Sequence, residues 1–376
     1  MRFLVLGAGR MGRAIAFDLV RTLGRDAVAV ADGSSDALDR IARWLEVRTH
    51  RLDLADTDAL RPLLERAEVA VSAADYALNL TLTRLCIETR THMLDLGGNN
   101  DVVAAQLALD AQAARAGVLV VPDCGLAPGL AVWLAARAVE RTRAPRAVRI
   151  RVGGLPARPE PPLGYALFFS VRGLINEYVE PPVALRSGRL VRLEPLGDVE
   201  PVELEAPFGT LEAFNTSGGC STLPQTLAGR VEELDYKTIR WPGHAAAMRA
   251  MLGIGLMSSE PLDVHGTRIA PRAVLEALLE RNLPRTDDDV VIVRVRCEGR
   301  DGQRVGYDLV DRYDPPTGQT AMARTTGYPT SIAARLIADG HVEARGVVPG
   351  ERCLPVDRIV EQLAERGVLV RTSDSG

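Results

Sequence analysis

Apolar and polar residues follow two kinds of pattern over the first 122 residues of the chain. Short apolar runs predict strands, and amphipathic segments such as residues 79–89 and 102–116 predict helices between them. The predicted strands are residues 2–6, 27–31, 47–52, 69–74, 91–96 and 118–121. Continuous apolar strands that alternate with helices are typical of an α/β fold with a doubly wound parallel sheet. Ligands of such sheets bind beyond the carboxyl ends of the strands.

The pattern changes after about residue 148, where the strands become longer and more polar. Strands are predicted there at residues 189–193, 199–204, 233–240, 290–297 and 304–312. Further helices are predicted at residues 130–141, 245–252, 271–281, 330–338 and 356–366, and turns at residues 153–156 and 159–164. We expect an α+β substrate domain with a mostly antiparallel sheet over residues 124–325. We expect the tail, residues 326–376, to return to a first domain formed by residues 1–123.

A glycine-rich turn joins the first predicted strand to the first helix. Gly7, Gly9 and Gly12 form the pattern Gly-x-Gly-x-x-Gly, with Arg10 and Met11 inside it. The first glycine permits the tight turn, the second lets the backbone approach a pyrophosphate, and the third lets helix and strand pack closely. The context predicts a Rossmann-type dinucleotide-binding site, against the alternative of a glycine-rich turn without a ligand.

An acid stands where such a site needs one. Asp32 ends the second strand, 20 residues after Gly12, and no arginine follows it at once. A carboxylate there accepts hydrogen bonds from the ribose hydroxyls and repels a 2′-phosphate, which favours NAD over NADP. Further candidates for cofactor contact follow the later strands: Asp53, Ala73, Ala74, Gly97 and Gly98. Asp53 has a second interpretation, as the cap of a helix that begins near residue 56.

Composition and charge narrow the class of protein. The chain of 376 residues is 47% hydrophobic and 25% charged, which suits an enzyme of about two domains. A net charge of −4 does not point to nucleic acid. The five cysteines show no paired spacing and the five histidines no ligand spacing, so we expect no metal. Neither a signal peptide nor an apolar run of about 18 residues is evident, so we expect a cytoplasmic protein without membrane contact.

Residues 235–244 hold the densest group of polar side chains. Lys237 is the only lysine in the chain, and on a strand it faces away from Arg240. A lysine or histidine of lowered pKa can move protons, so Lys237 and His244 are both candidate bases, and Arg240 is the candidate cation for a substrate carboxylate. The alternative interpretation is a solvated strand edge with a structural histidine.

Several motifs in a fixed order resemble the saccharopine dehydrogenase superfamily, and within it most closely the lysine 6-dehydrogenases. Besides the glycine-rich turn they are residues 95–99, 123–129, 153–156, 162–165, 221–224 and 237–244. The similarity runs along nearly the whole chain, to about residue 349.

The resemblance implies a homodimer, built on the substrate domain, that uses NAD. It implies oxidation of the side-chain amine of L-lysine to 2-aminoadipate 6-semialdehyde, which cyclises to piperideine-6-carboxylate, with release of ammonia and NADH. The shared motifs place the following residues at the active site: Asp123 with Lys237 and His244 as catalytic groups, and Arg240, Tyr165, Thr222 and Cys124 as substrate contacts.

Two alternatives stay open. One is a saccharopine or carboxynorspermidine-type dehydrogenase that acts on a secondary amine. Saccharopine-forming relatives often carry an acid where this chain has Ala127, and its loss weakens that interpretation. The other is a non-catalytic NAD-binding subunit, against which the intact cluster of residues 237–244 argues.

Overall fold

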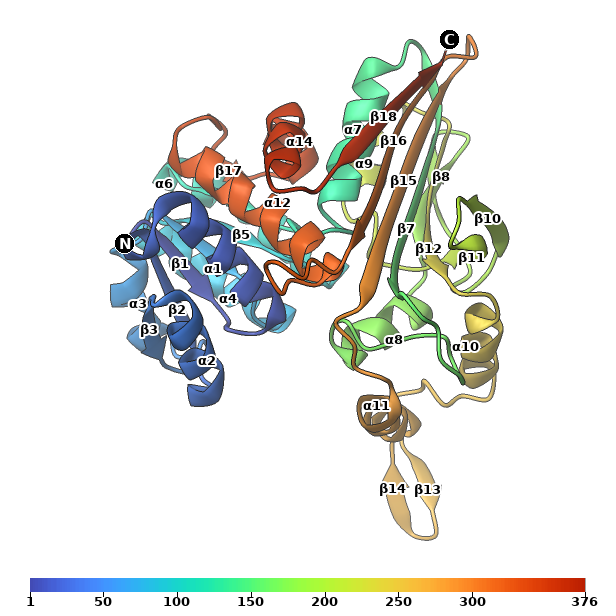
Figure 1. Ribbon diagram of the computed structural model, residues 1–376, viewed down its shortest axis with the longest axis horizontal. Helices are drawn as coiled ribbons and strands as arrows, with labels where there is room; N and C mark the ends of the chain where they lie inside the picture. The colour runs from blue at the N-terminus through green and yellow to red at the C-terminus, as the bar shows by residue number, and fades with distance from the viewer. Residues whose placement is uncertain (376) are drawn as a thin grey trace. The chain divides into compact units, whose positions relative to one another are not determined.

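A computed structural model describes residues 1–375, and the chain divides into two compact units. The first unit contains residues 1–137 and 323–370, and the second contains residues 138–322 and the chain from 371 on. Each unit has its own large sheet, and the elements are labelled in Figure 1.

The first unit is built on a parallel sheet of seven strands in the order β17-β6-β5-β4-β1-β2-β3. The strands are β1 (Phe3–Leu6), β2 (Val28–Asp32), β3 (Arg48–Arg51), β4 (Val69–Ser72), β5 (His92–Asp95), β6 (Leu119–Val121) and β17 (Gly346–Val347). The buried apolar side chains of the inner strands explain why this segment forms a sheet with both faces covered. The predicted doubly wound α/β sheet is confirmed, and β17 adds a strand from the returning tail.

The helices of this unit are α1 (Arg10–Leu23), α2 (Ser35–Leu45), α3 (Thr57–Leu64), α4 (Asn79–Thr89), α5 (Asn100–Leu107), α6 (Asp110–Ala116), α13 (Gly350–Cys353) and α14 (Val356–Glu365). Two more, α7 (Leu130–Arg141) and α12 (Ala321–Ala338), carry the chain from one unit into the other. Helix α12 begins earlier than predicted because it continues through Pro329, where a helix was expected to start.

A buried ion pair fastens the returning tail to the first helix. Asp18 on α1 accepts hydrogen bonds from Arg366 Nε at 2.7 Å and from Ser331 Oγ at 2.5 Å. The charged side chains of Asp18 and Arg366 are almost fully buried. Each neutralises the other, because burying either charge alone would be costly in free energy. The tail as far as residue 370 belongs to the first unit.

The second unit holds a mixed sheet of nine strands, with the main order β10-β11-β12-β7-β15-β16-β18; β8 pairs with β12, and β9 pairs with β8. Its strands are β7 (Pro145–Pro156), β8 (Val183–Arg186), β9 (Arg189–Arg192), β10 (Glu200–Leu204), β11 (Gly209–Asn215), β12 (Glu233–Arg240), β15 (Asp289–Gly299), β16 (Arg304–Arg312) and β18 (Val370–Ser375). Strands β7 and β12 run parallel, whereas β10–β11, β11–β12, β7–β15 and β15–β16 are antiparallel. The mostly antiparallel sheet is thus confirmed.

The remaining elements of the second unit are helices α8 (Val171–Val179), α9 (Leu223–Leu227), α10 (His244–Gly253) and α11 (Pro271–Asn282), and the hairpin β13 (Leu262–Val264) with β14 (Thr267–Ile269). Helices α8 and α10 lie at the same end of the sheet in Figure 1. They share a hydrophobic core that includes Leu174 and Met248.

The structure corrects two expectations. Residues 153–156 are not a turn but the end of central strand β7. Glycine is needed there for close packing, because a Cβ atom at Gly153 would lie 2.8 Å from Ile239 Cβ. The chain also crosses between units inside α7 and α12, and β18 joins the second sheet instead of the first domain. Across residues 1–375, none of the helices combines the length and the apolar character needed to cross a membrane.

Candidate functional site

The glycine-rich turn has room only for glycine at two of its three positions. Gly7 has φ of 104°, and a Cβ atom there would lie 2.7 Å from the Ala73 carbonyl oxygen. A Cβ atom at Gly12 would lie 1.9 Å from the Gly7 carbonyl oxygen. Gly9 differs, because a Cβ atom there would meet nothing within 4 Å. Its missing side chain therefore leaves open space beside the start of α1, where the backbone N–H groups of a helix attract an anion.

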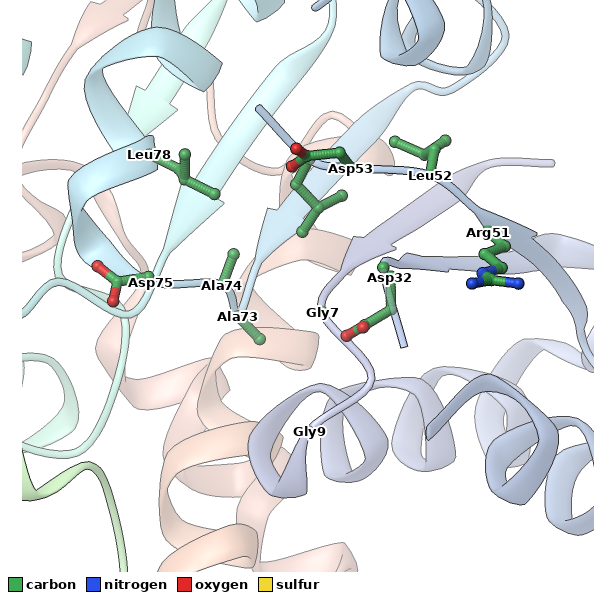
Figure 2. Close-up of a pocket in the computed structure, with 12 residues that line it drawn as sticks. Gly7, Gly9, Asp32, Arg51, Leu52, Asp53, Ala73, Ala74, Asp75 and Leu78 are labelled. Atoms are coloured by element: carbon green, nitrogen blue, oxygen red, sulfur yellow. The ribbon is translucent and has the colours of Figure 1, made fainter. Parts of the chain in front are cut away.

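A cavity of about 670 Å³ opens beside this turn (Figure 2). Six of the residues predicted to contact a cofactor line it: Gly7, Gly9, Asp32, Asp53, Ala73 and Ala74. Arg10, Met11 and Gly12 form the first turn of α1. Gly97 and Gly98 are not among the lining residues of the cavity; their φ values are 72° and 122°. The glycine turn, the helix start and the small alanines together fit the pyrophosphate and ribose of a dinucleotide.

Asp32 is held in one orientation above the glycine turn. Its Oδ2 accepts a hydrogen bond from the Ala8 N–H at 2.6 Å, and its Oδ1 accepts one from the Ser34 N–H at 2.7 Å. Figure 2 shows the carboxylate turned toward the loop that carries Gly9. Each oxygen keeps a further lone pair, which a ribose hydroxyl can use.

Arg51 lines the same cavity and was not among the predicted site residues. It ends β3, where it lies in register with Asp32 on the parallel neighbour β2. No arginine follows Asp32 directly in the sequence, but the parallel pairing of β2 and β3 places Arg51 next to it. The acid and the guanidinium favour opposite forms of cofactor, because one repels a 2′-phosphate and the other attracts it.

The two interpretations of Asp53 are now separated. Asp56 caps α3 by accepting a hydrogen bond from the Ala59 N–H at 3.1 Å. Asp53 instead bonds the Ala55 N–H at 2.9 Å and lines the cavity. The capping role belongs to Asp56, and Asp53 stays a candidate for cofactor contact.

The turn after β6 brings Asp123 against Gly97. A Cβ atom on Gly97 would lie 1.7 Å from Asp123 Oδ1, so only glycine fits beside this carboxylate. Asp123 itself has φ of 60°. The buried Asp95 carboxylate holds both turns, since its Oδ1 accepts hydrogen bonds from the N–H groups of Gly97 at 2.8 Å and Asp123 at 3.2 Å. Burial raises the pKa of Asp95, and these hydrogen bonds oppose the shift.

Cys124 points into the core of the first unit. Its side chain is fully buried, its thiol lies 3.3 Å from the Val121 carbonyl oxygen, and burial raises its pKa. Its own carbonyl oxygen accepts a hydrogen bond from Thr330 Oγ1 at 2.5 Å. The thiol thus packs inward in this unit, and its contact with a substrate stays a prediction.

In the second unit, several polar side chains gather around Arg240 on one face of β12. We call them the Arg240 cluster: Tyr165, Glu177, Tyr178, Arg240 and His244. The Arg240 side chain is only 4% exposed, and its guanidinium carbon lies 4.9 Å from the centre of the Tyr165 ring. Its Nη2 lies 3.8 Å from Glu177 Oε2. The structure thus joins Arg240, Tyr165 and His244, which the sequence predicted, with Glu177 and Tyr178, which it did not.

His244 begins α10 and uses both ring nitrogens. Its Nδ1 lies 3.0 Å from the Leu163 carbonyl oxygen, and its Nε2 lies 2.9 Å from the Tyr178 hydroxyl. A carbonyl oxygen can only accept, so Nδ1 carries the proton and Nε2 accepts the hydrogen bond of Tyr178. Burial and then the charge of Arg240 lower the pKa of His244 to about 3. The imidazole is therefore neutral.

Glu177 lies on α8, a helix that the sequence analysis missed. Its side chain is 27% exposed, and burial raises its pKa to about 7 against the opposing charge of Arg240. The available signal was spacing, because Glu177 and Tyr178 stand three and four residues after the buried Leu174. An acid next to the apolar face of a helix indicates a buried polar site.

Lys237 lies apart from this cluster. Its side chain is 2% exposed, and its Nζ lies 2.8 Å from Asp198 Oδ2, 2.7 Å from Glu200 Oε2 and 2.6 Å from the Asp198 carbonyl oxygen. These three acceptors match the three donors of an ammonium group. The alternation of β12 turns Lys237 to the face opposite Arg240, so its ammonium group lies outside the Arg240 cluster. Its role as a base stays a prediction.

The other candidates have separate places. Thr222 precedes α9, at its N-cap position. Tyr165 lines a second cavity of about 230 Å³, with Pro156, Arg158, Glu160, Ala166, Pro284, Thr286 and Asp288. Within residues 1–375, no three histidine, cysteine or acidic side chains gather as metal ligands would.

Two family models match the chain. The model described as the saccharopine dehydrogenase NADP binding domain matches residues 3–121, and the model described as the saccharopine dehydrogenase C-terminal domain matches residues 125–368. Together they span both compact units.

Individual proteins are similar at low identity. The mitochondrial alpha-aminoadipic semialdehyde synthase of Mus musculus is 22% identical over 457 residues, an alignment that covers 100% of this chain and 48% of that protein. The chain thus spans about half the length of this relative. The saccharopine dehydrogenase [NADP(+), L-glutamate-forming] of Pyricularia oryzae is 22% identical over 443 residues, with 96% of both chains covered.

Solved structures share the fold. Apo saccharopine dehydrogenase (L-Glu forming) from Saccharomyces cerevisiae superimposes with a TM-score of 0.81 at 20% identity, over 100% of both chains. A homospermidine synthase from Legionella pneumophila in complex with NAD superimposes with a TM-score of 0.69 at 13% identity, over 100% of this chain and 91% of that one.

Proposed function

Because the chain belongs to the saccharopine dehydrogenase family of oxidoreductases, we propose that it oxidises the side-chain amine of L-lysine with NAD. The products are 2-aminoadipate 6-semialdehyde, ammonia and NADH. In keeping with the resemblance of the sequence, we also propose that it works as a homodimer.

The observation that carries the proposal is a pair of unused donors in the Arg240 cluster. Arg240 Nε and the Tyr165 hydroxyl are both buried, and neither has a hydrogen-bond partner among the described residues. A buried donor without a partner costs about 1–3 kcal/mol, so two of them in one cluster indicate a site built for an absent acceptor. A guanidinium beside a phenol hydroxyl suits a carboxylate, as an amino-acid substrate provides.

The residues of the first unit fit the cofactor. Gly9 and the start of α1 would hold its pyrophosphate, and Asp32 would hold the adenosine ribose. The cofactor supplies a hydride acceptor for the carbon that bears the amine. The fixed carboxylate of Asp32 supports NAD, and the placement of Arg51 in the same cavity makes some use of NADP reasonable.

A second candidate is oxidation of a secondary amine. It is supported by the relative from Pyricularia oryzae, whose printed name is saccharopine dehydrogenase and which aligns over 96% of its length. Ala127 favours L-lysine over saccharopine as the substrate, because saccharopine-forming enzymes often carry an acid at that place in the motif.

A panel of substrates separates the two. Reduced cofactor is measured by absorbance with L-lysine, L-ornithine, saccharopine and carboxynorspermidine, each with NAD and with NADP. We expect the highest kcat/KM with L-lysine and NAD. A higher kcat/KM with saccharopine would select the second candidate, and reduction of neither cofactor by any amine would contradict both.

A further inference from the structure

Oxidation of a protonated amine requires a group that takes up a proton before hydride can leave, and the Arg240 cluster contains one that fits. We propose that the carboxylate of Glu177 binds the reacting ammonium group of the substrate and accepts its proton. This inference rests on the proposed amine oxidation and assigns the base within it.

The other titratable groups of the cluster are occupied or protonated. Both nitrogens of His244 are engaged, one by the Leu163 carbonyl and one by the Tyr178 hydroxyl. Burial raises the pKa of Tyr178 to about 12 and that of Tyr165 above its ordinary value, so both phenols keep their protons. The same holds for Tyr236, a buried tyrosine of β12 outside the cluster. Arg240 cannot give up its proton in a protein.

A second carboxylate close enough to act on Tyr178, that of Glu212, is committed elsewhere. Glu212 on β11 accepts hydrogen bonds from the N–H of Gly243 at 3.0 Å and from the N–H of Ala245 at 2.7 Å, so it holds the start of α10. The Glu177 carboxylate does not hold the start of a helix in this way; it faces Arg240. Its 3.8 Å separation from Arg240 Nη2 is longer than a hydrogen bond, which leaves its oxygens able to accept from a ligand.

Exposure also favours Glu177. Its side chain is 27% exposed, whereas that of Arg240 beside it is 4% exposed. The Glu177 side chain is thus partly open to solvent, whereas the Arg240 side chain is buried. The pKa of about 7 fits a general base, because it lets the group be ionised at neutral pH and still hold a proton.

The proton and the electrons balance in two steps. The substrate ammonium R–CH2–NH3+ gives one proton to the Glu177 carboxylate and becomes the neutral amine. The carbon–hydrogen bond then breaks, its electron pair leaves as hydride to NAD+, and the substrate carbon is oxidised to the iminium R–CH=NH2+ while NAD+ is reduced to NADH. Water adds to the iminium, the carbon–nitrogen bond breaks, the nitrogen leaves as ammonium, and the aldehyde results.

The test compares Glu177→Gln and Glu177→Asp with Glu260→Gln, which makes the same charge change at an exposed position. With the best substrate of the panel, kcat/KM is measured from about pH 5.5 to 9.5. For the wild type and Glu260→Gln we expect kcat/KM to rise through a pKa near 7. Glu177→Gln should lose at least about 100-fold and lose the rising limb, while Glu177→Asp keeps the limb with a smaller loss.

Two further readouts make the result decisive. NADH binding, followed by fluorescence, and thermal unfolding show whether Glu177→Gln is folded. Calorimetry of L-lysine binding in two buffers of different ionisation heat counts the protons exchanged on binding, without turnover. A rising limb retained in Glu177→Gln, or a loss below about tenfold, would overturn the role of Glu177 while leaving amine oxidation intact. A wild type that neither binds nor oxidises any amine would overturn both.

Discussion

The Tyr178 hydroxyl donates a hydrogen bond to Nε2 of His244 at 2.9 Å, because the Leu163 carbonyl oxygen requires the other ring nitrogen, Nδ1, to be the donor. The histidine therefore orients a tyrosine in the Arg240 cluster and is not placed to take a proton from a ligand. Within the cluster, the Glu177 carboxylate beside Arg240 is then the group able to act as a base.

Replacing His244 tests this positioning role. In His244→Ala, Tyr178 loses its acceptor, and we expect a loss of about tenfold in kcat with the rising limb of kcat/KM near pH 7 retained. The neutral histidine also contributes stability. Its pKa is lowered to about 3 in the folded protein, so this contribution is present above about pH 6.5 and is lost as the pH falls toward 3.

Thermal unfolding between about pH 7 and 4 checks the second part. The Tm of the wild type should fall more steeply than that of His244→Ala over this window. If kcat/KM of His244→Ala no longer depended on pH near 7, the base role would return to the histidine.

Glu177 should cost stability where it is ionised. Its raised pKa means that the folded protein holds more protons than the unfolded chain between about pH 4.5 and 7, so stability falls as the pH rises through this window. Glu177→Gln removes that penalty and should unfold at a higher temperature than the wild type at pH 8. Calorimetric scans of the wild type and Glu177→Gln at pH 8 and at pH 5 measure this difference. A lower Tm for Glu177→Gln than for the wild type at pH 8 would contradict a destabilising effect of the ionised carboxylate.

Lys237 is expected to serve stability. Lys237→Arg keeps the charge but cannot place a compact ammonium among Asp198 and Glu200, so we expect a lower Tm with kcat within about threefold of the wild type. Lys237→Met leaves the two carboxylates without their cation and should cost about 1–3 kcal/mol, since both remain partly exposed. A kcat reduced tenfold or more in a stably folded Lys237→Arg would instead support its role as a base.

Asp32 and Arg51 should act in opposite directions on the choice of cofactor. Asp32→Ala removes the charge that repels a 2′-phosphate, so kcat/KM with NADP should rise relative to NAD. Arg51→Ala removes the cation and should shift the ratio toward NAD. The ratio of the two kcat/KM values, with the same amine, measures both. An unchanged ratio in both variants would mean that neither side chain contacts the 2′ position.

The sequence predicted the strands and helices well where burial alone decides them. Six of the seven strands of the first sheet, together with strands β12 and β16, follow from apolar runs and alternation. Gly153 and Gly154 were misassigned to a turn, because the tight packing that demands glycine in β7 comes from Ile239 and Met322, which are distant in the sequence.

The candidate site was predicted only in part for the same reason. The alternation of β12 separates Lys237 from Arg240, yet the acceptors that hold Lys237 come from Asp198 and from Glu200 on β10. Strand β10 pairs with β11, and its place in the sheet cannot be inferred from spacing. Glu177 was missed because its helix was missed. Its chemistry depends on burial near Arg240, a contact between elements and not a local pattern.

The proposed reaction oxidises the side-chain amine of L-lysine and leaves its α-amine intact. L-lysine labelled with 15N at the ε position is incubated with the enzyme and NAD, and the ammonia released is analysed by mass spectrometry while NADH is measured by absorbance. We expect one labelled ammonia for each NADH formed. Unlabelled ammonia would instead indicate oxidation at the α carbon. Reduction of the cofactor only with a secondary amine, without release of ammonia, would rule out oxidation of the lysine side chain.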